Sequence, residues 1–387
     1  MEGTTSAMNL TICIATPHTL SGSANAAHLW IFINWALGLR SLGCRVFWLE
    51  DVGPLAAPRL MRDIENALAD LQDRLRPLGL ADDVVVASLH DHGPVALPID
   101  GTPDLAGALE ADLLINFLYA APATFVRRFR RSALVDVDPG LLQTWMNRAQ
   151  ITVAPHDRYF TIGETVGTSS ARFPGWGAPW QYTPPPVFLP AWPVVTADAS
   201  ARYTTVTGWW DKWMELDGEM FSNEKRTAFL KYLELPRRVP REMELSIILD
   251  DFTLSTDRVI LEQYGWKVGE ARDLCATPER FREYVQGSRG EFTCARPSAG
   301  RLNSTWVSDR TVCYLASGKP AVVEYTAPSR YAPEGGLVRF KTMEEVVAAL
   351  EAIESDYGRH SRLAREIAEE HFDATKVARS VLERALE

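Results

Sequence analysis

The sequence predicts an α/β protein with two domains, each built on a parallel β-sheet that helices cover. Two observations support this fold class. Short apolar runs typical of buried strands alternate with amphipathic helical segments from one end of the chain to the other. A segment rich in proline and tryptophan separates two such series near the middle of the chain. The length of 387 residues also suits two domains.

The first series begins with an apolar strand, a turn-rich loop and a helix. Leu29, Ile33 and Leu37 lie on one face of this helix, and Gly43 ends it. Another strand and an amphipathic helix follow, which is the alternation of a parallel sheet. Strands are expected at residues 10–16, 45–50, 84–88, 112–117 and 132–137, and helices at residues 26–42 and 57–76.

The middle segment carries seven prolines between residues 173 and 193. That many prolines exclude a regular element, and the tryptophans among them favour an ordered connection over a loose linker. We therefore expect a first domain over residues 1–195, an interdomain segment over residues 173–200 and a second domain over residues 200–372. The second series predicts strands at 203–207, 243–249, 265–268, 291–295, 321–324 and 338–340, and helices at 223–233, 257–264, 278–286, 342–353, 359–371 and 375–386.

Composition narrows the function classes. The net charge of −10 argues against a nucleic acid as the main partner but permits a small anion held by local cations. The five cysteines are widely spaced and lie mostly in apolar runs, which indicates reduced, buried thiols and a cytoplasmic location. We see no signal peptide and expect no membrane span. A homodimer is left open.

The most informative segment is residues 304–320. Ser308 and Asp309 can cap a helix whose first turn carries Arg310 and Thr311. Such a helix start offers unpaired N–H groups, the positive end of the helix dipole and one guanidinium, which together suit a diphosphate. The segment ends at Gly318 before a buried strand. A phosphate-binding helix late in a long α/β chain indicates an enzyme that uses a nucleotide sugar.

At these residues the chain resembles glycosyltransferases of the GT-B fold. Residues 314–322 resemble that family's helix-to-strand end, and Ser21-Gly22-Ser23 resembles its glycine-rich loop. Further runs are similar to a largely uncharacterised group of bacterial glycosyltransferase-like proteins: residues 135–140, 156–164, 286–289 and 306–310.

The resemblance implies two Rossmann-like domains that face each other across a cleft, with a last helix at residues 373–387 that returns to the first domain. It also implies transfer of a sugar from a nucleoside-diphosphate sugar to a small-molecule or glycan acceptor. No cofactor is expected besides this co-substrate. The chain departs from the best-known retaining pattern, because Thr305 and Cys313 stand where those enzymes carry two glutamates.

The donor-side candidates belong to the second domain. Gly208 permits close backbone approach, and Trp209 can stack on a base or simply pack in the core. Arg289 lies in a turn before a strand, where it is either a diphosphate ligand or a solvated arginine. The full donor-binding set is Gly208, Trp209, Arg289, Ser308, Asp309, Arg310 and Thr311.

The acceptor-side candidates belong to the first domain. The candidate catalytic bases are His18, Asp138 and His156, each of which adjoins an expected strand. His18 follows the first strand, and a histidine with a near-neutral pKa suits proton abstraction from a hydroxyl. Asp138 is alternatively a helix cap before Pro139. Gly22 and Ser23 can contact phosphate or acceptor, or simply start the first helix.

Three other interpretations stay open. Asp136-Val137-Asp138 matches the D-x-D motif that binds a divalent metal in the other major glycosyltransferase fold, although three-residue motifs occur by chance. A sugar-nucleotide 2-epimerase shares the two-domain fold. A non-catalytic nucleotide-sugar-binding homologue is the third alternative. We expect a metal-independent glycosyltransferase with no metal site.

Overall fold

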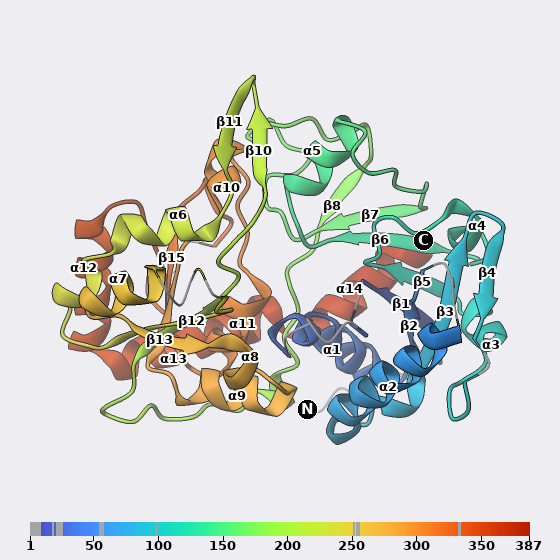
Figure 1. Ribbon diagram of the computed structural model, residues 1–387, viewed down its shortest axis with the longest axis horizontal. Helices are drawn as coiled ribbons and strands as arrows, with labels where there is room; N and C mark the ends of the chain where they lie inside the picture. The colour runs from blue at the N-terminus through green and yellow to red at the C-terminus, as the bar shows by residue number, and fades with distance from the viewer. Residues whose placement is uncertain are drawn as a thin grey trace. The chain divides into compact units, whose positions relative to one another are not determined.

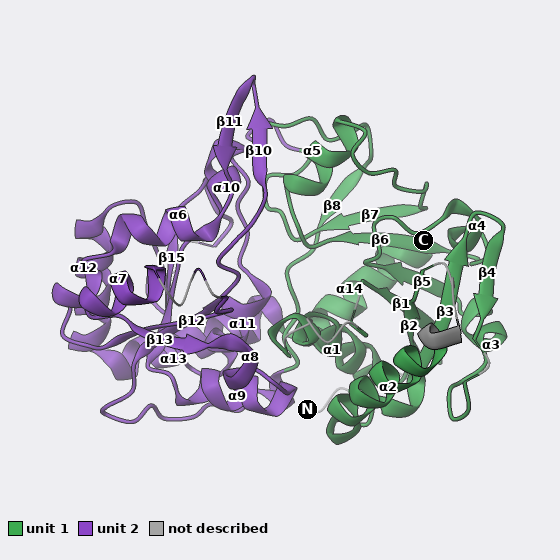
Figure 2. Cartoon of the chain, in the orientation of Figure 1, with its two compact units in different colours: residues 1–167, 173–188, 373–387 green, residues 168–172, 189–372 purple. Residues whose placement is uncertain are grey.

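The computed structural model describes residues 9–17, 19–20, 26–53, 58–97, 99–250, 252, 256–331 and 334–387. The chain divides into two compact units (Figure 2). Unit 1 comprises residues 1–167, 173–188 and 373–387, and unit 2 comprises residues 168–172 and 189–372. Residues 189–195, which the sequence analysis assigned to the first domain, therefore lie in unit 2. All five cysteines are buried free thiols.

Unit 1 is built on an eight-stranded sheet with the order β4-β3-β2-β1-β5-β6-β7-β8 (Figure 1). Every neighbouring pair is parallel except β3 with β4. Alternate residues of β2 face opposite sides, so Phe47 packs with α3 and α4 while Trp48 packs with Phe32 of α1. The strands are β1 (Thr11–Thr16), β2 (Arg45–Asp51), β3 (Val84–His90), β4 (Gly93–Ala96), β5 (Leu113–Asn116), β6 (Ser132–Asp136), β7 (Arg158–Thr161) and β8 (Trp180–Tyr182).

The last helix of the chain packs against the first helix, both in unit 1. A Cβ atom at Gly38 would stand 2.7 Å from the carbonyl oxygen of Ala374, so only glycine permits this approach. The hydroxyls of Ser41 and Thr375 hydrogen-bond across the same contact at 2.8 Å. The helices of unit 1 are α1 (Ala26–Ser41), α2 (Pro58–Leu75), α3 (Leu105–Leu109), α4 (Ala123–Val126), α5 (Leu141–Asn147) and α14 (Ala374–Leu386).

The proline-rich segment contains a strand, which corrects the expectation that it holds no regular element. β8 lies between Pro179 and Thr183 and pairs in parallel with β7. It is the outermost strand of its sheet, where one row of N–H groups needs no partner. Prolines on either side of a three-residue edge strand therefore remove no ladder hydrogen bond.

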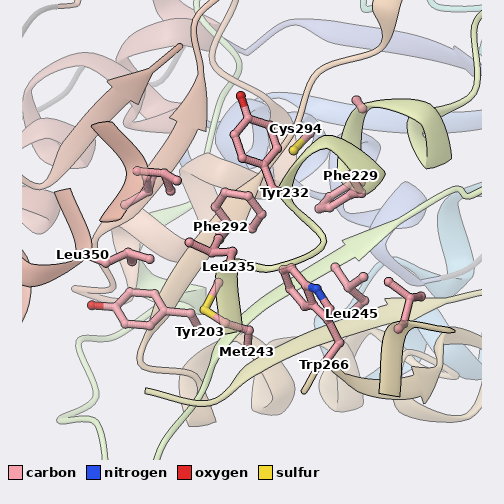
Figure 3. Packing of buried hydrophobic residues seen from close by; sticks show 14 of the residues in the cluster. Tyr203, Phe229, Tyr232, Leu235, Met243, Leu245, Trp266, Phe292, Cys294 and Leu350 are labelled. Atoms are coloured by element: carbon pink, nitrogen blue, oxygen red, sulfur yellow. The ribbon is translucent and has the colours of Figure 1, made fainter. Parts of the chain in front are cut away.

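Unit 2 is built on a six-stranded, all-parallel sheet with the order β13-β12-β9-β14-β15-β16. Its core is aromatic, and Phe292 stacks on Phe340 with ring centres 5.4 Å apart. The rings of Tyr232 and Trp266 each lie 6.0 Å from that of Phe292 (Figure 3). The strands are β9 (Tyr203–Thr207), β12 (Met243–Ile247), β13 (Lys267–Glu270), β14 (Gly290–Thr293), β15 (Ala321–Glu324) and β16 (Leu337–Phe340).

The helices of unit 2 cover this sheet, and a hairpin is inserted after its first strand. The hairpin consists of β10 (Trp213–Leu216) and β11 (Glu219–Ser222), which the sequence analysis did not predict. No helix among the residues that the structure describes is both long and apolar enough to cross a bilayer. The helices are α6 (Lys225–Phe229), α7 (Arg258–Gln263), α8 (Ala271–Leu274), α9 (Pro278–Gly287), α10 (Pro297–Arg301), α11 (Asp309–Ala316), α12 (Met343–Ser355) and α13 (Tyr357–Ile367).

Candidate functional site

The amino end of α11 has the capped geometry that its sequence predicts. Ser308 is the N-cap residue, and its Oγ accepts a hydrogen bond from the N–H of Thr311 at 3.1 Å. The two hydroxyls also hydrogen-bond to each other at 2.9 Å. Asp309 and Arg310 form the first turn, where backbone N–H groups have no acceptor within the helix and the dipole is positive. Ser308 thus shapes the helix start and leaves the amides of Asp309 and Arg310 for a ligand.

A recess opens beside this helix start, within unit 2. It lies between the carboxyl ends of β14 and β15, the edge of an open parallel sheet at which ligands bind. Its volume of about 40 Å³ accommodates a few water-sized groups, so it can receive one small part of a ligand whose remainder lies outside. Its polar lining residues include Lys225, Thr293, Ser308, Thr311, Glu324, Thr326 and Arg339.

Cations gather around the recess. Burial lowers the pKa of Lys225 to about 7, and the positive charges of Arg310 and Arg296 add to this effect. Among the described residues Arg310 forms a loose ion pair, with its Nη1 3.9 Å from Asp309 Oδ2. A bound anion would remove the mutual repulsion of these groups and restore the charge on Lys225. The arrangement therefore favours a phosphate or diphosphate.

A buried acid lies beneath the same helix start. Glu291 of β14 is 2% exposed, and burial raises the pKa of its carboxyl to about 7, although Thr311, Arg310 and Lys225 partly offset this effect. Within the described part of the chain its Oε2 has no hydrogen-bond partner. Glu291 therefore balances part of the positive charge around Lys225 and Arg310 while the recess is empty.

A strand supplies the carboxylate that α11 lacks. Thr305 and Cys313 are fully buried, and the Cys313 thiol donates to the Asp309 carbonyl at 3.2 Å. Glu324, at the end of β15, lines the recess, and burial raises the pKa of its carboxyl. Its Oε2 accepts the N–H of Ala295 at 2.9 Å. This carboxylate can accept a hydrogen bond from a ribose or sugar hydroxyl.

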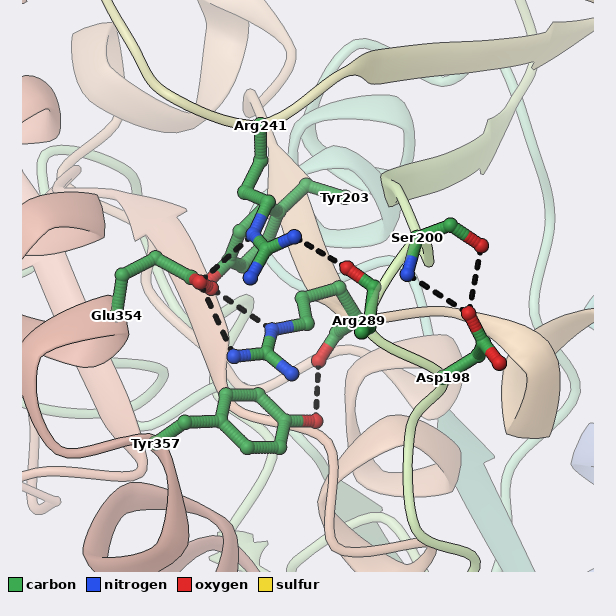
Figure 4. A network of polar contacts seen from close by, with 8 residues as sticks. Asp198, Ser200, Tyr203, Arg241, Arg289, Glu354 and Tyr357 are labelled. Atoms are coloured by element: carbon green, nitrogen blue, oxygen red, sulfur yellow. Dashed lines mark hydrogen bonds and ion pairs between the residues drawn. The ribbon is translucent and has the colours of Figure 1, made fainter.

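The structure does not bring Arg289 to the recess. Arg289 precedes β14, whereas the recess lies beyond the other end of that strand, roughly 13 Å away at 3.3 Å per residue. Its Nε and Nη2 donate to Glu354 at 2.8 and 3.0 Å, and its guanidinium stacks on Tyr357 at 3.5 Å (Figure 4). Arg241 donates to the same carboxylate at 2.8 Å. Arg289 thus holds α12 and α13 to the amino edge of the sheet.

Gly208 and Trp209 follow β9 at the carboxyl edge, with different surroundings. Trp209 is 1% exposed, belongs to the aromatic core and donates from Nε1 to Asp257 at 2.8 Å. Arg226 also donates two hydrogen bonds to the Asp257 carboxylate, at 2.6 and 2.8 Å. Trp209 therefore packs in the core, the alternative that the sequence left open. Gly208 is exposed, and a Cβ there would meet no atom within 4 Å.

In unit 1, Asp138 follows β6 at the carboxyl edge of its sheet. The Tyr119 hydroxyl lies 3.3 Å from its carboxylate. The N-cap of α5 is Gly140, and the backbone carbonyl of Asp138 accepts the N–H groups of Leu141 and Leu142 at 3.0 and 3.1 Å. His18, Gly22 and Ser23 lie outside the described residues. Glu50 holds the loop after β1, because its buried carboxylate accepts the N–H of Thr19 at 3.0 Å and that of Leu20 at 3.3 Å.

Protein groups already donate hydrogen bonds to the carboxylate of Asp136, which bears on whether Asp136-Val137-Asp138 is a metal-binding D-x-D motif. Its Oδ2 accepts hydrogen bonds from Gln143 at 2.9 Å and Thr161 at 2.8 Å, and its Oδ1 accepts the N–H of Asp138 at 2.9 Å. Burial raises the pKa of Asp136 to about 6. The side chain thus organises the end of β6, and no group of three or more metal-ligating side chains occurs among the described residues.

His156 is a buried histidine with both ring nitrogens engaged. Its Nδ1 lies 2.7 Å from the Ala154 carbonyl and its Nε2 lies 3.0 Å from the Asn116 amide nitrogen. The carbonyl requires a proton on Nδ1, and Nε2 then accepts from the amide. Burial lowers the pKa of His156 to about 4. A neutral imidazole whose Nε2 lone pair already accepts a hydrogen bond is poorly suited to act as a catalytic base.

This placement predicts a pH dependence for His156→Gln. Between pH 4 and 6.5 the unfolded state binds a proton at His156 that the folded state does not, so wild-type stability rises with pH there. The stability advantage of the wild type over the variant should therefore grow by up to about 1.4 kcal/mol per pH unit in this window. Urea unfolding of both proteins at pH 5, 6 and 7 measures it. An advantage that is constant with pH would show that the imidazole is solvated.

Lys225 and Glu324 are among the lining residues of the recess that sequence analysis missed. Lys225 was placed inside a longer predicted helix, and the inserted hairpin hid its position directly beyond the first strand of the second domain. Glu324 was recognised only as the end of a buried strand. A signal was available for both, since charged residues at the carboxyl ends of parallel strands are candidates for ligand contacts.

Several solved protein structures share this architecture. An alpha-glucosyltransferase in complex with UDP-glucose and DNA containing an abasic site matches with a TM-score of 0.60 at 9% identity, covering 98% of this chain and 100% of that one. Anabaena HepE in complex with UDP-glucose matches with a TM-score of 0.54 at 12% identity, covering 97% of this chain and 99% of that one. Sucrose-phosphate synthase from Thermosynechococcus elongatus matches with a TM-score of 0.54 at 11% identity, covering 97% of this chain and 98% of that one. No protein-family model and no curated protein sequence matches the chain. The chain has the GT-B fold, with two Rossmann-like units.

Proposed function

We propose that the protein is a metal-independent glycosyltransferase that moves a sugar from a nucleoside-diphosphate sugar to a small-molecule or glycan acceptor. The observation that carries this proposal is the cationic recess at the amino end of α11, at the ligand-binding edge of the unit 2 sheet. Several neighbours in fold are described in complex with UDP or UDP-glucose, which supports the donor class. The reduced, buried cysteines support a cytoplasmic location.

The residues around the recess suit the binding of a diphosphate leaving group. Lys225 and Arg310 supply positive charge, and the amides of Asp309 and Arg310 supply directed N–H donors. When the bond to the sugar breaks, negative charge develops on the leaving diphosphate, and preorganised donors stabilise that charge. Glu324 accepts a ribose hydroxyl in place of the absent helix glutamates. Asp309, whose Oδ2 has no hydrogen-bond partner in the described structure, is available to a sugar hydroxyl.

On the acceptor side, Asp138 is the group that we propose as the base. It stands at the carboxyl edge of the unit 1 sheet, where its carboxylate lies 3.3 Å from the Tyr119 hydroxyl. A carboxylate there can take the proton of an acceptor hydroxyl as that oxygen attacks the sugar carbon. His156 lacks this capacity because both of its nitrogens are engaged.

The test is donor binding and transfer in the presence of a chelator. UDP should raise the melting temperature with EDTA present, because protein cations, rather than a metal, hold the diphosphate. A panel of UDP-, GDP- and dTDP-sugars, incubated with mixed sugar and phenol acceptors, should yield nucleoside diphosphate only when acceptor is added. Sugar isomerisation without acceptor would indicate an epimerase. Binding without turnover across the panel would indicate a non-catalytic homologue, and activity that requires added manganese would contradict metal independence.

A further inference from the structure

The hairpin β10–β11 interrupts the connection between β9 and α6 at the carboxyl edge of the unit 2 sheet. Figure 1 shows it projecting beyond α6 and α10. Its two-residue turn is Asp217-Gly218, with φ of 53° and 81°, as type I′ hairpin turns require. An ordinary Rossmann-like unit needs only a short loop here, so the twelve residues 211–222 are an addition whose side chains call for an explanation.

The two faces of this hairpin differ sharply. The register pairs Trp213 with Ser222 and Glu215 with Met220, so these four side chains share one face. On that face Trp213 is 63% exposed and Met220 is 57% exposed. The opposite face packs against its own unit, because the guanidinium of Arg301 stacks on the Phe221 ring at 4.2 Å. One face is therefore fixed to the protein, and the other presents a tryptophan to the outside.

A hydrogen bond and an ion pair connect the base of the hairpin to residues near the recess. Asn223 Oδ1 accepts the N–H of Ser298 at 2.9 Å, and Asp211 pairs with Arg296 at 3.2 Å. Arg296 is one of the cations that act on Lys225, which follows the hairpin by three residues and lines the recess. The tryptophan face thus belongs to an arm whose base adjoins the proposed donor site, within the same unit.

Charge decides which class of ligand suits this face. The segment 211–222 carries four carboxylates and one lysine, and three of the carboxylates, Glu215, Asp217 and Glu219, are exposed. This balance repels nucleic acids and anionic lipid surfaces. A neutral carbohydrate meets no such repulsion. Its C–H faces pack on an indole ring, and its hydroxyls donate to a carboxylate such as Glu215 beside that ring.

We propose that the face formed by Trp213, Glu215, Met220 and Ser222 binds a neutral carbohydrate chain, which is the acceptor in the transfer reaction proposed above. The identification as acceptor rests on that proposed function, whereas carbohydrate binding by the hairpin does not. The assignment contrasts with the fold neighbour whose complex contains DNA. It narrows the acceptor class from small molecule or glycan to glycan.

The test uses the full chain and three soluble neutral polysaccharides as probes: dextran, soluble starch and galactomannan. In affinity gel electrophoresis at least one of them should retard the wild type. Trp213→Ala should weaken that binding roughly tenfold, and Trp213→Tyr should recover part of it. Trp176→Ala, which removes a tryptophan 43% exposed in unit 1, should have no effect.

Three outcomes would overturn the proposal: no retardation by any probe, binding that is equal in Trp213→Ala and wild type, or a wild-type dimer that Trp213→Ala converts to a monomer. The last would identify a second copy of the chain as the occupant. Calorimetry with UDP distinguishes a failure of the carbohydrate-binding proposal from a failure of the proposed donor site. Trp213→Ala should bind UDP like wild type, and failure of both proteins to bind UDP would count against the donor site alone.

Discussion

Lys225→Met weakens UDP binding by about 30- to 100-fold and leaves the protein folded. The expected loss corresponds to one hydrogen bond between charged groups in a partly desolvated site. Lys225 lines the recess, and methionine keeps the length and apolar stem of the side chain. Because burial already lowers the pKa of this amine, its removal relieves an unfavourable charge in the empty protein. Titration calorimetry measures the affinity, and urea unfolding confirms the fold.

A pH series distinguishes a phosphate contact from a general effect on structure. The pKa of free Lys225 is about 7, so the charged form that binds diphosphate is lost as pH rises through 7. Wild-type affinity for UDP should therefore fall between pH 7 and 9, whereas Lys225→Met should show no such decline. Lys267→Met, at an exposed lysine of the edge strand β13, is the matched control and should bind UDP like wild type. Wild-type affinity in Lys225→Met would remove this residue from the donor site.

Glu354→Ala lowers the free energy of unfolding by about 3 kcal/mol, the lower end of the cost of removing one partner from a buried ion pair, because Glu354 and Arg241 are partly exposed. Glu354 accepts hydrogen bonds from Arg289, from Arg241 and, at 2.9 Å, from the Tyr203 hydroxyl (Figure 4). Burial opposes ionisation of this carboxyl, but these hydrogen bonds outweigh it and lower its pKa. The substitution leaves two guanidinium groups without their shared acceptor, and urea unfolding at pH 7 measures the loss.

The control lies on the same helix. Glu351→Ala removes an exposed glutamate of α12 and should change stability by less than about 0.5 kcal/mol. The folded fraction of Glu354→Ala should still bind UDP with wild-type affinity, because the network lies at the edge of the sheet opposite the recess. A variant that is stable yet cannot bind UDP would return Arg289 to the donor site and add Glu354 to it.

Much of the fold follows from local patterns in the sequence. The alternation of apolar strands and amphipathic helices predicts both parallel sheets, since periodicity reports burial directly. The start of α11 also follows from Ser308, because a cap is an interaction between residues three apart. The shift of β13 to Lys267–Glu270, two residues beyond the expected strand, is an ordinary boundary difference.

Features that depend on distant partners could not be predicted in the same way. Arg289, at the amino end of β14, pairs with Glu354, which lies 65 residues further along the chain. The Nε2 of His156 is engaged by Asn116, 40 residues earlier. No local pattern contains either pairing. The hairpin is a different case, because Asp217-Gly218 between alternating apolar and polar residues is a strong hairpin signal that went unused.

The measurement that tests the central claim most directly is a crystal structure of the protein with UDP bound. The diphosphate oxygens should lie within hydrogen-bonding distance of Lys225 Nζ and of the backbone amides of Asp309 and Arg310, with the ribose at Glu324. UDP bound elsewhere, with the amino end of α11 in contact only with solvent, would contradict the account.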